Sequence, residues 1–223
     1  MNFMVTISSI IFVVKNLREP EIKDKRILEV GSYNSRTNIG TYIDSLRPKS
    51  YIGTDINDGP DVNVVCSAES LLEKFNKRSF DTVISIEVLE HVIDWRKVIS
   101  NIKNLCKSGG IILITTRSYG FEYHLSPRDY WRYEIDDMKY IFSDFEILEI
   151  EKDRDAPGVF LKAKKPQKFI EKDLSDYKLY NIVANKRISS VKGRPSLHFY
   201  YFFLRAELKR IVVNAGKALF SMI

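Results

Sequence analysis

Cysteine is scarce in this chain of 223 residues, which contains only Cys66 and Cys106. Two cysteines form neither a disulfide framework nor a cysteine-rich zinc site, so we expect a protein of the reducing cytoplasm. The chain also lacks an apolar run of about 18 residues, the length that a membrane-spanning helix requires. Its most apolar stretch, 3–14, has no basic segment before it and no small-residue cleavage site after it, unlike a secretory signal. We expect that stretch to form a packed N-terminal helix.

Glycine is also sparse, and the G-x-G-x-x-G fingerprint of dinucleotide-binding proteins is missing. Gly31 follows a short apolar run, but Tyr33 stands where the second glycine would be. That glycine lets a pyrophosphate approach the start of a helix, so its absence argues against NAD or FAD. A nucleoside cofactor without a pyrophosphate is still compatible with the sequence.

The charge is divided unevenly along the chain. Residues 1–160 carry 21 basic and 25 acidic side chains, a net charge of −4, whereas 161–223 carry 14 basic and 4 acidic side chains, a net charge of +10. A basic segment attracts anionic partners such as membrane surfaces or nucleic acid, although a solvated face without a partner has the same composition. The acidic body makes nucleic acid the less favoured partner.

Strand and helix patterns alternate through the middle of the chain, which predicts an α/β fold with a parallel sheet. A Pro-Gly pair at 157–158 separates the last two strands and predicts a hairpin, so the seven-stranded sheet is mixed and its last strand antiparallel. The connection 57–61 is short, and we expect the third strand to be marginal. The expected strands are 26–31, 50–56, 62–66, 80–87, 110–116, 145–151 and 159–163, and the expected helices are 37–46, 95–105 and 136–142.

Three segments follow from this pattern: an N-terminal helical extension (1–25), the α/β domain (26–165) and a basic, mostly helical extension (166–223) without further strands. Helical apolar spacing runs through 197–222, with basic residues beside it. Such a helix can pack on its own domain, join subunits of a homo-oligomer, or lie on a membrane surface. We therefore expect a cytoplasmic protein, with peripheral contact at the inner membrane face as an alternative.

Polar residues gather where the predicted strands end. Ligands of doubly wound sheets bind at the carboxyl ends of the strands, so these residues are the candidates for binding a cofactor. Asp55 lies 24 residues after Gly31, the placement expected of a carboxylate that accepts hydrogen bonds from both ribose hydroxyls of a nucleoside. The candidates are Glu29, Gly31, Ser32 and Tyr33 after the first strand, Asp55 and Ile56 after the second, Ser67, Ala68 and Glu69 after the third, and Ser85 and Glu87 after the fourth.

Five segments together resemble class I S-adenosylmethionine-dependent methyltransferases, in the same order and spacing over about 26–165. They are ILEVGS (27–32), YIGTDI (51–56), CSAESL (66–71), FDTVISIEVLEHV (80–92) and LCKSGGIILITTRS (105–118). Within that class, TTRSYGFEYH (115–124) and DYWRYE (129–134) are similar to a group associated with surface-glycan and polysaccharide biosynthesis. The resemblance implies a doubly wound, Rossmann-like fold, S-adenosylmethionine as cofactor, and a small-molecule acceptor such as a sugar.

The resemblance also implies a role for each candidate. Glu29 and Gly31 would flank the methionine part of the cofactor, and Asp55 would hold its ribose. The segment 67–69 would lie at the adenine, and the backbone of 85–87 at the sulfonium. The sequence departs from the family pattern at Tyr33 and Ser35, which replace glycines, and at Ser67, which replaces an aspartate. These departures leave a non-catalytic scaffold as an alternative.

Methylation of a sugar hydroxyl requires a base, because the protonated hydroxyl is a poor nucleophile. His91 and His124 are the candidates, although His91 could instead orient the turn after the fourth strand. The side chains of Tyr130, Trp131 and Arg132 are expected to line the acceptor pocket, where aromatic faces stack on sugar rings and a guanidinium binds anionic groups. A lid packed on the sheet edge is the alternative for these three.

The spacing Glu87-x-x-Glu90-His91 resembles the metal-binding turn of small-RNA terminal 2′-O-methyltransferases. It leaves open a metal-assisted RNA 2′-O-methyltransferase, in which His124 would be the fourth ligand of a magnesium or manganese ion. Many methyltransferases carry this string without a metal, so a divalent metal is not expected.

Overall fold

The computed structural model describes residues 6–33, 39–124, 128–191 and 195–220. Its centre is a seven-stranded sheet with the order β3-β2-β1-β4-β5-β8-β7. β8 runs antiparallel to both of its neighbours, β5 and β7, and the other pairs are parallel. The predicted α/β fold with an antiparallel hairpin strand is thereby confirmed. The strands are β1 (Arg26–Val30), β2 (Ser50–Asp55), β3 (Val64–Val65), β4 (Phe80–Ile86), β5 (Cys106–Arg117), β7 (Glu146–Lys152) and β8 (Gly158–Lys164).

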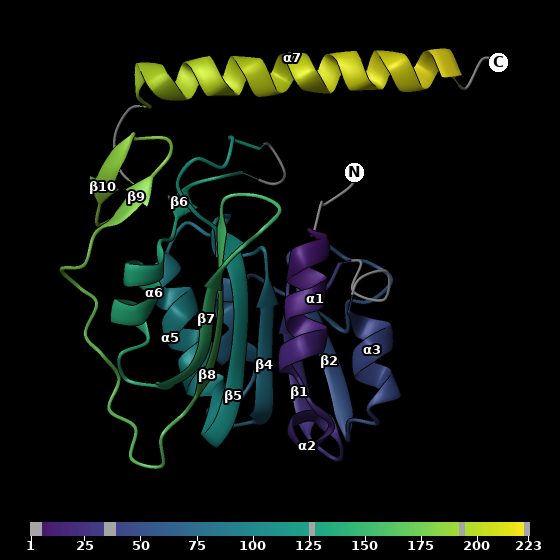
Figure 1. The fold of residues 1–223 in the computed structure, drawn as a ribbon, viewed down its shortest axis with the longest axis vertical. Helices are drawn as coiled ribbons and strands as arrows, with labels where there is room; N and C mark the ends of the chain where they lie inside the picture. Colours follow the sequence, from purple (N-terminus) through teal and green to yellow (C-terminus); the bar gives the residue numbers. More distant parts are fainter. Residues whose placement is uncertain (1–5, 34–38, 125–127, 192–194, 221–223) are drawn as a thin grey trace.

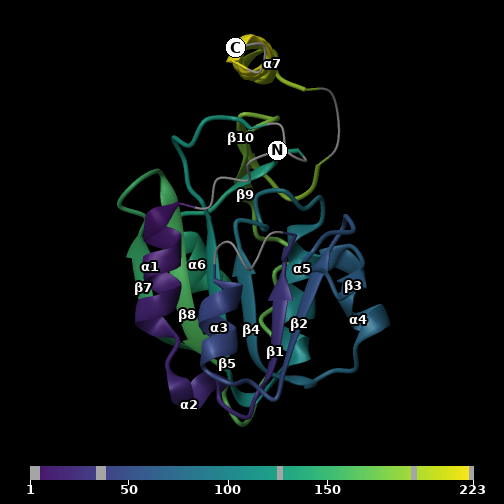
Figure 2. The ribbon, with the colours of Figure 1, turned by 90° about the vertical axis from the view of Figure 1, so that its right-hand side faces the viewer.

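Helices cover both faces of this sheet, as Figures 1 and 2 show. One face packs against α1 (Ile7–Asn16), α2 (Glu19–Ile22) and α3 (Gly40–Ser45), and the other against α4 (Leu71–Lys74), α5 (Trp95–Leu105) and α6 (Ile135–Ile141). The apolar runs of β1 and β4 are buried because both faces are covered, which explains why they do not alternate with polar residues. A short 3₁₀ helix, η2 (Ala68–Ser70), precedes α4.

The N-terminal stretch is a helix packed on the sheet, as the sequence predicts. Phe12 of α1 is buried and its ring centroid lies 5.1 Å from that of Phe160 in β8. The hydroxyl of Thr6 caps α1 and donates a hydrogen bond of 3.0 Å to Asp153. The α1 helix is therefore attached to the domain by both apolar and polar contacts.

The connections follow the sequence with a few differences. The β3 strand has only two residues, in keeping with the short connection before it. The predicted helix 37–46 begins at Gly40 among the described residues, while 37 and 38 lie outside them. The β5 strand starts four residues earlier than predicted, and its register against β4 shifts between Phe80 and Thr82.

The prediction that no strand follows residue 164 is wrong. The strands β9 (Leu179–Asn181) and β10 (Lys186–Ile188) form a hairpin, and β9 also pairs with β6 (Trp131–Arg132). Strands of three residues are too short to show an alternating pattern in the sequence. This small sheet fastens the C-terminal segment over the loop that follows β5 (Figure 1).

The last helix, α7 (Leu197–Phe220), lies beyond the carboxyl ends of the parallel strands (Figures 1 and 2). Its first turns contact the body, since the rings of Phe199 and Phe203 lie 5.2 and 6.4 Å from that of Tyr123. Arg205 also pairs with Glu122 at 3.2 Å. Within the described part of the chain, no helix has both the length and the apolar character needed to cross a bilayer.

Candidate cofactor and acceptor site

Gly31 begins the loop after β1 and adopts a left-handed backbone conformation, with φ of +85°. A Cβ atom here would lie 2.3 Å from Cγ2 of Val88, in the loop after β4. The amides of Gly31 and Ser32 both donate to the carbonyl of Thr54, at 2.7 and 3.0 Å. A glycine is therefore required at this point, where the loops after β1 and β4 meet.

Ser32 and Tyr33, both predicted to bind the cofactor, contact the connection between β2 and β3. The buried hydroxyl of Ser32 donates to the carbonyl of Asp61 at 3.0 Å. The ring of Tyr33 lies over Gly59, where an added Cβ would be 2.7 Å from Cδ2 of the tyrosine. These two side chains shape the loop, and Ser35 lies outside the described residues.

Asp55 ends β2, next to the loop that begins at Gly31. Its Oδ1 accepts a hydrogen bond of 2.9 Å from the amide of Asn57, and its side chain is only partly buried. Ile56, which follows it, is 61% exposed. A carboxylate beside an exposed apolar side chain suits a ribose diol joined to an aromatic base, because the base would cover the isoleucine.

Glu29 lies on β1 and is almost completely buried. The hydroxyl of Tyr51, its diagonal neighbour on β2, donates a hydrogen bond to Oε2 of this carboxylate. The contact satisfies one carboxylate oxygen, as burial of a charged group requires. The predicted contact between Glu29 and a cofactor stays a prediction.

The segment 67–69, whose contact with adenine stays a prediction, makes hydrogen bonds within the protein. The hydroxyl of Ser67 caps η2 by accepting from the amide of Glu69 at 3.2 Å. The carboxylate of Glu69 accepts from the amides of Ile93 and Asp94, at 3.0 and 2.8 Å. The carbonyl of Ala68 accepts from Asn101 at 2.8 Å. These groups tie η2 to the start of α5, so their polar atoms are engaged within the protein.

Glu87 follows β4 with a φ of +54° and forms a buried ion pair with Arg117, at the end of β5. Arg117 also contacts Asp153 at 3.1 Å. Burial and the negative charge of Glu90 raise the pKa of Glu87, and the positive charge of Arg117 opposes this shift. The hydroxyl of Ser85 is buried and has no hydrogen-bond partner among the described residues.

Sequence reasoning missed Arg117 and Asp153, which hold Glu87 in place. A signal for Arg117 was present, because a charged residue that closes a buried apolar strand requires a partner. Asp153 gave no comparable signal, since it meets Arg117 only through the pairing of β5 with β8.

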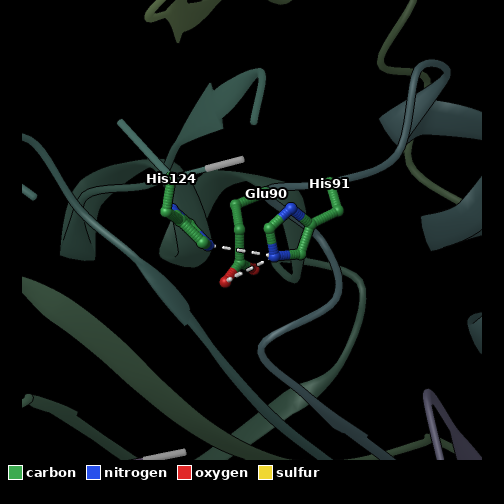
Figure 3. A group of neighbouring side chains, drawn as sticks. All are labelled: Glu90, His91 and His124. Atoms are coloured by element: carbon green, nitrogen blue, oxygen red, sulfur yellow. Dashed lines mark hydrogen bonds and ion pairs between the residues drawn. The ribbon is translucent and has the colours of Figure 1, made fainter. Parts of the chain in front are cut away.

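The side chains of Glu90, His91 and His124 meet in one cluster, as Figure 3 shows. Nε2 of His124 lies 3.0 Å from Nε2 of His91, which lies 3.9 Å from Oε1 of Glu90. Glu90 is fully buried, and the hydroxyl of Thr116 donates to its Oε2 at 2.9 Å. The structure thus brings together both predicted histidines and Glu90, which were noted as metal ligands, but it pairs Glu87 with Arg117 instead.

The two histidines are held by the loop after β5. The carbonyl of Arg128 accepts from Nδ1 of His91, and Nδ1 of His124 lies 2.8 Å from the carboxylate of Asp129. Burial and the neighbouring His124 lower the pKa of His91 to about 4. Burial also disfavours charge on His124, but Asp129 outweighs it and raises the pKa of His124. Sequence reasoning missed Asp129. The available signal was its spacing of three residues from Arg132, a spacing at which opposite charges can pair.

The residues predicted to line the acceptor pocket are buried instead. The indole of Trp131 is completely buried and donates to the carbonyl of Val92 at 2.8 Å. Arg132 is 1% exposed and forms two hydrogen bonds with Asp129, at 2.5 and 2.6 Å. The amide of Tyr130 donates to the carbonyl of Glu90 at 2.8 Å, and its ring is buried. Both side chains are engaged in packing the loops, which agrees with the alternative of a packed lid, and the predicted contact of Trp131 and Arg132 with an acceptor stays a prediction.

A comparison with protein families identifies the family to which this chain belongs. Residues 10–151 match a family model described as a methyltransferase domain, which spans more than half of the chain. The chain belongs to this methyltransferase family. The match includes most of α1, in agreement with the packing of that helix on the sheet. No curated protein sequence matches the chain significantly.

Solved structures confirm the methyltransferase fold at low sequence identity. The 1,6-didemethyltoxoflavin N1-methyltransferase of Burkholderia thailandensis, solved with its substrate and S-adenosylhomocysteine, is 12% identical with a TM-score of 0.57, covering 71% of this chain and 78% of that one. An S-adenosylmethionine-dependent methyltransferase of Mesorhizobium loti is 14% identical with a TM-score of 0.53. The match covers 69% of this chain and 96% of that one. The [4+2]-cyclase SpnF, at 14% identity and a TM-score of 0.55, covers 70% and 79%. Because a cyclase shares it, the fold alone does not fix the reaction.

Membership of this family implies S-adenosylmethionine as the cofactor, and part of the predicted site fits it. Asp55 and Ile56 offer a carboxylate and an exposed apolar surface at adjacent positions, and Gly31 brings the loop after β1 against the loop after β4. The segment 67–69 fits less well, because its polar side chains are engaged. Recognition of the adenine edge would then depend on backbone groups and on apolar contact.

Proposed function

We propose that the protein is an S-adenosylmethionine-dependent methyltransferase that transfers a methyl group to a hydroxyl of a sugar or another small acceptor. The observation that carries the proposal is the arrangement at the carboxyl ends of the strands. The Asp55–Ile56 surface and the cluster of Glu90, His91 and His124 lie on one edge of the sheet. The contact between Gly31 and Val88 joins the two loops involved.

Each part of this edge has a physical task in the proposed reaction. Asp55 accepts hydrogen bonds from the ribose hydroxyls, and Ile56 packs against the base. Bound S-adenosylmethionine supplies an electrophilic methyl group. Methyl transfer is a direct displacement, so the protein mainly places the acceptor oxygen in line with that group, and orientation of this kind contributes about 7–11 kcal/mol in favourable cases.

The acceptor hydroxyl must lose its proton as the new bond forms. The cluster of Glu90, His91 and His124 offers two imidazoles and a carboxylate for this step. His124 is the most accessible of the three, with a side chain that is 34% exposed. Its orientation by Asp129 resembles the way in which carboxylates hold catalytic histidines.

A sugar acceptor is supported by the aromatic loop after β5. Tyr119 lies two residues beyond the end of that strand and is 64% exposed, and its ring lies 4.9 Å from that of Tyr180. An exposed tyrosine face can stack on a sugar ring. A role in polysaccharide biosynthesis belongs to the same proposal, and it rests on the similarity of 115–124 and 129–134 to the surface-glycan group.

Calorimetric titration with S-adenosylmethionine tests the cofactor site. We expect Asp55→Ala to weaken binding by about 100-fold or more, because two hydrogen bonds to a charged acceptor are lost. The matched control is Asp58→Ala, which removes an exposed carboxylate from the same connection. Wild-type affinity in Asp55→Ala would place the cofactor elsewhere, and no heat with the wild-type protein at millimolar ligand would support a non-catalytic scaffold.

The acceptor class is tested by transfer of a labelled methyl group to cell-envelope glycans and, in parallel, to RNA. The proposal predicts label in the glycan fraction. Label in RNA alone would favour the RNA 2′-O-methyltransferase instead. That alternative is weakened by the ion pair of Glu87 with Arg117, which removes one of the four predicted metal ligands.

A further inference from the structure

The two imidazoles of the cluster are fixed in the same tautomer by their surroundings. Nδ1 of His91 faces the carbonyl of Arg128, which only accepts hydrogen bonds, so this nitrogen carries the proton. Nδ1 of His124 lies 2.8 Å from the carboxylate of Asp129, which is buried and paired with Arg132, and this negative charge favours a proton on that nitrogen. In both neutral rings, the lone pair is on Nε2.

The two Nε2 atoms lie 3.0 Å apart, with the rings edge to face and their centroids 4.6 Å apart. Two hydrogen-bond acceptors at this distance repel, so the arrangement requires a positive charge between them. Oε1 of Glu90 adds a third donor atom, since it lies 3.9 Å from Nε2 of His91 and has no hydrogen-bond partner among the described residues. Figure 3 shows the three groups converging from two loops. A fully buried carboxylate oxygen that lies close to two imidazole nitrogens is a donor set that a metal ion can use.

We propose that Glu90, His91 and His124 bind a divalent transition-metal cation through Oε1, Nε2 and Nε2. The three donor atoms lie within 4.8 Å of one another, so a single ion can contact all of them. Two imidazoles and one carboxylate suit zinc, manganese or iron better than magnesium or calcium, which prefer oxygen ligands. Asp129 is a positioning residue, because it orients His124 without contacting the ion.

This set differs from the four ligands that the sequence spacing indicates. Glu87 is excluded because its carboxylate pairs with Arg117, and the remaining three ligands leave coordination positions open. An acceptor hydroxyl bound at an open position would lose its proton more easily, since the cation stabilises the alkoxide, and with the cation bound the two imidazoles would act as ligands and not as the base. This last role rests on the proposed function, whereas binding of the cation does not.

Metal binding can be measured without cofactor or acceptor, so its outcome is independent of the titration with S-adenosylmethionine. Full-length protein is treated with a chelator, dialysed, and titrated with Zn²⁺ by calorimetry and with Co²⁺ by visible absorption. We expect one ion per chain and a Co²⁺ spectrum without thiolate charge-transfer bands. Asp129→Asn should weaken binding about 10–100-fold, the usual effect of losing a group that orients a ligand. His124→Ala and Glu90→Gln should weaken it further.

The matched control is His198→Ala, which removes the remaining histidine, an exposed residue of α7. It should bind Zn²⁺ like the wild type. Circular dichroism identifies any variant that fails to fold. If Glu90→Gln does not fold, the metal affinities of His91→Ala and His124→Ala test the proposal. The proposal is overturned if the wild type binds no ion, if both histidine variants bind like the wild type, or if thiolate bands appear. If no ion binds, the positive charge between the two Nε2 atoms would be a proton that the two rings share.

Discussion

At the scale of single residues, the site depends on buried charges that satisfy one another. Arg132 donates to both oxygens of Asp129 and to the carbonyls of Phe121, Glu122 and Trp131. The positive charge of Arg132 lowers the pKa of Asp129 well below its usual range, although burial opposes this. Asp129 in turn orients His124. A residue that the sequence suggested for acceptor binding is therefore part of the framework behind the histidines.

Replacement of this arginine tests that role. Arg132→Lys keeps the charge but loses the planar fork that meets both carboxylate oxygens, so we expect about 2–3 kcal/mol of destabilisation. For a protein of this size the melting temperature should fall by about 5–10 °C, with little change in affinity for S-adenosylmethionine. The control is Arg128→Lys, because that residue is exposed. An unchanged melting temperature would show that the guanidinium is dispensable for the fold.

At the scale of elements, α7 is unusual because much of its apolar surface is exposed. Leu204, Leu208, Ile211 and Val212 follow helical spacing and are 60, 62, 59 and 69% exposed. Among the side chains of α7 that the structure describes, Phe199 and Phe203 pack on the body through their contacts with Tyr123. The surrounding segment is strongly basic, so two copies would repel each other while an anionic surface would attract it. From these features we propose that α7 lies on an anionic membrane surface and not against a second subunit.

Cosedimentation with lipid vesicles measures this interaction. We expect binding to vesicles that contain anionic phosphatidylglycerol, weaker binding to phosphatidylcholine, and a decrease as salt rises. The double variant Leu204→Glu, Leu208→Glu should bind at least about tenfold more weakly, because both apolar contacts are lost. Ile170→Glu is the control, since Ile170 is 86% exposed but lies outside α7. Equal binding of all three proteins would argue against a membrane role for the helix.

At the scale of the whole molecule, two apolar cores lie on opposite faces of one sheet. The smaller core depends on α1, whose Phe12 and Val13 are buried against β8 and its neighbours. The polar end of α1 reaches the same ion-pair network as the site, since Thr6 donates to Asp153 and Ser9 to Glu87. The N-terminal helix is thus structurally part of the methyltransferase domain.

Truncation of one side chain shows how much this helix contributes. We expect Phe12→Ala to destabilise the protein by about 3–5 kcal/mol, because it leaves a cavity against Phe160. Ile11→Ala is a suitable control on the same helix, since Ile11 is 58% exposed. Chemical denaturation of both variants gives the two free energies of unfolding. Similar values would mean that α1 is only loosely attached.

Much of the fold was predictable because local patterns and the sheet topology agree. The helix 95–105 has the predicted bounds, since its apolar face and the capping side chain of Asp94 are both local features of the sequence. Asp55 and Ile56 were also found correctly at a strand end, because the ends of parallel strands follow directly from the strand pattern. The hairpin of β9 and β10 was missed, because strands this short exist only through their pairing with β6.

The strand pattern of the sequence was enough to place the main strands along the chain, the carboxyl edge of the sheet and the two histidines near that edge. Which charged groups pair depended on how the chain folds. Glu87 and Glu90 are three residues apart, yet one meets Arg117 and the other faces His91. Partners such as Asp153 and Asp129 come from other parts of the chain, and their contacts depend on how strands and loops pack. Burial then makes each pairing obligatory, since an unpaired charge in the interior is too costly to keep.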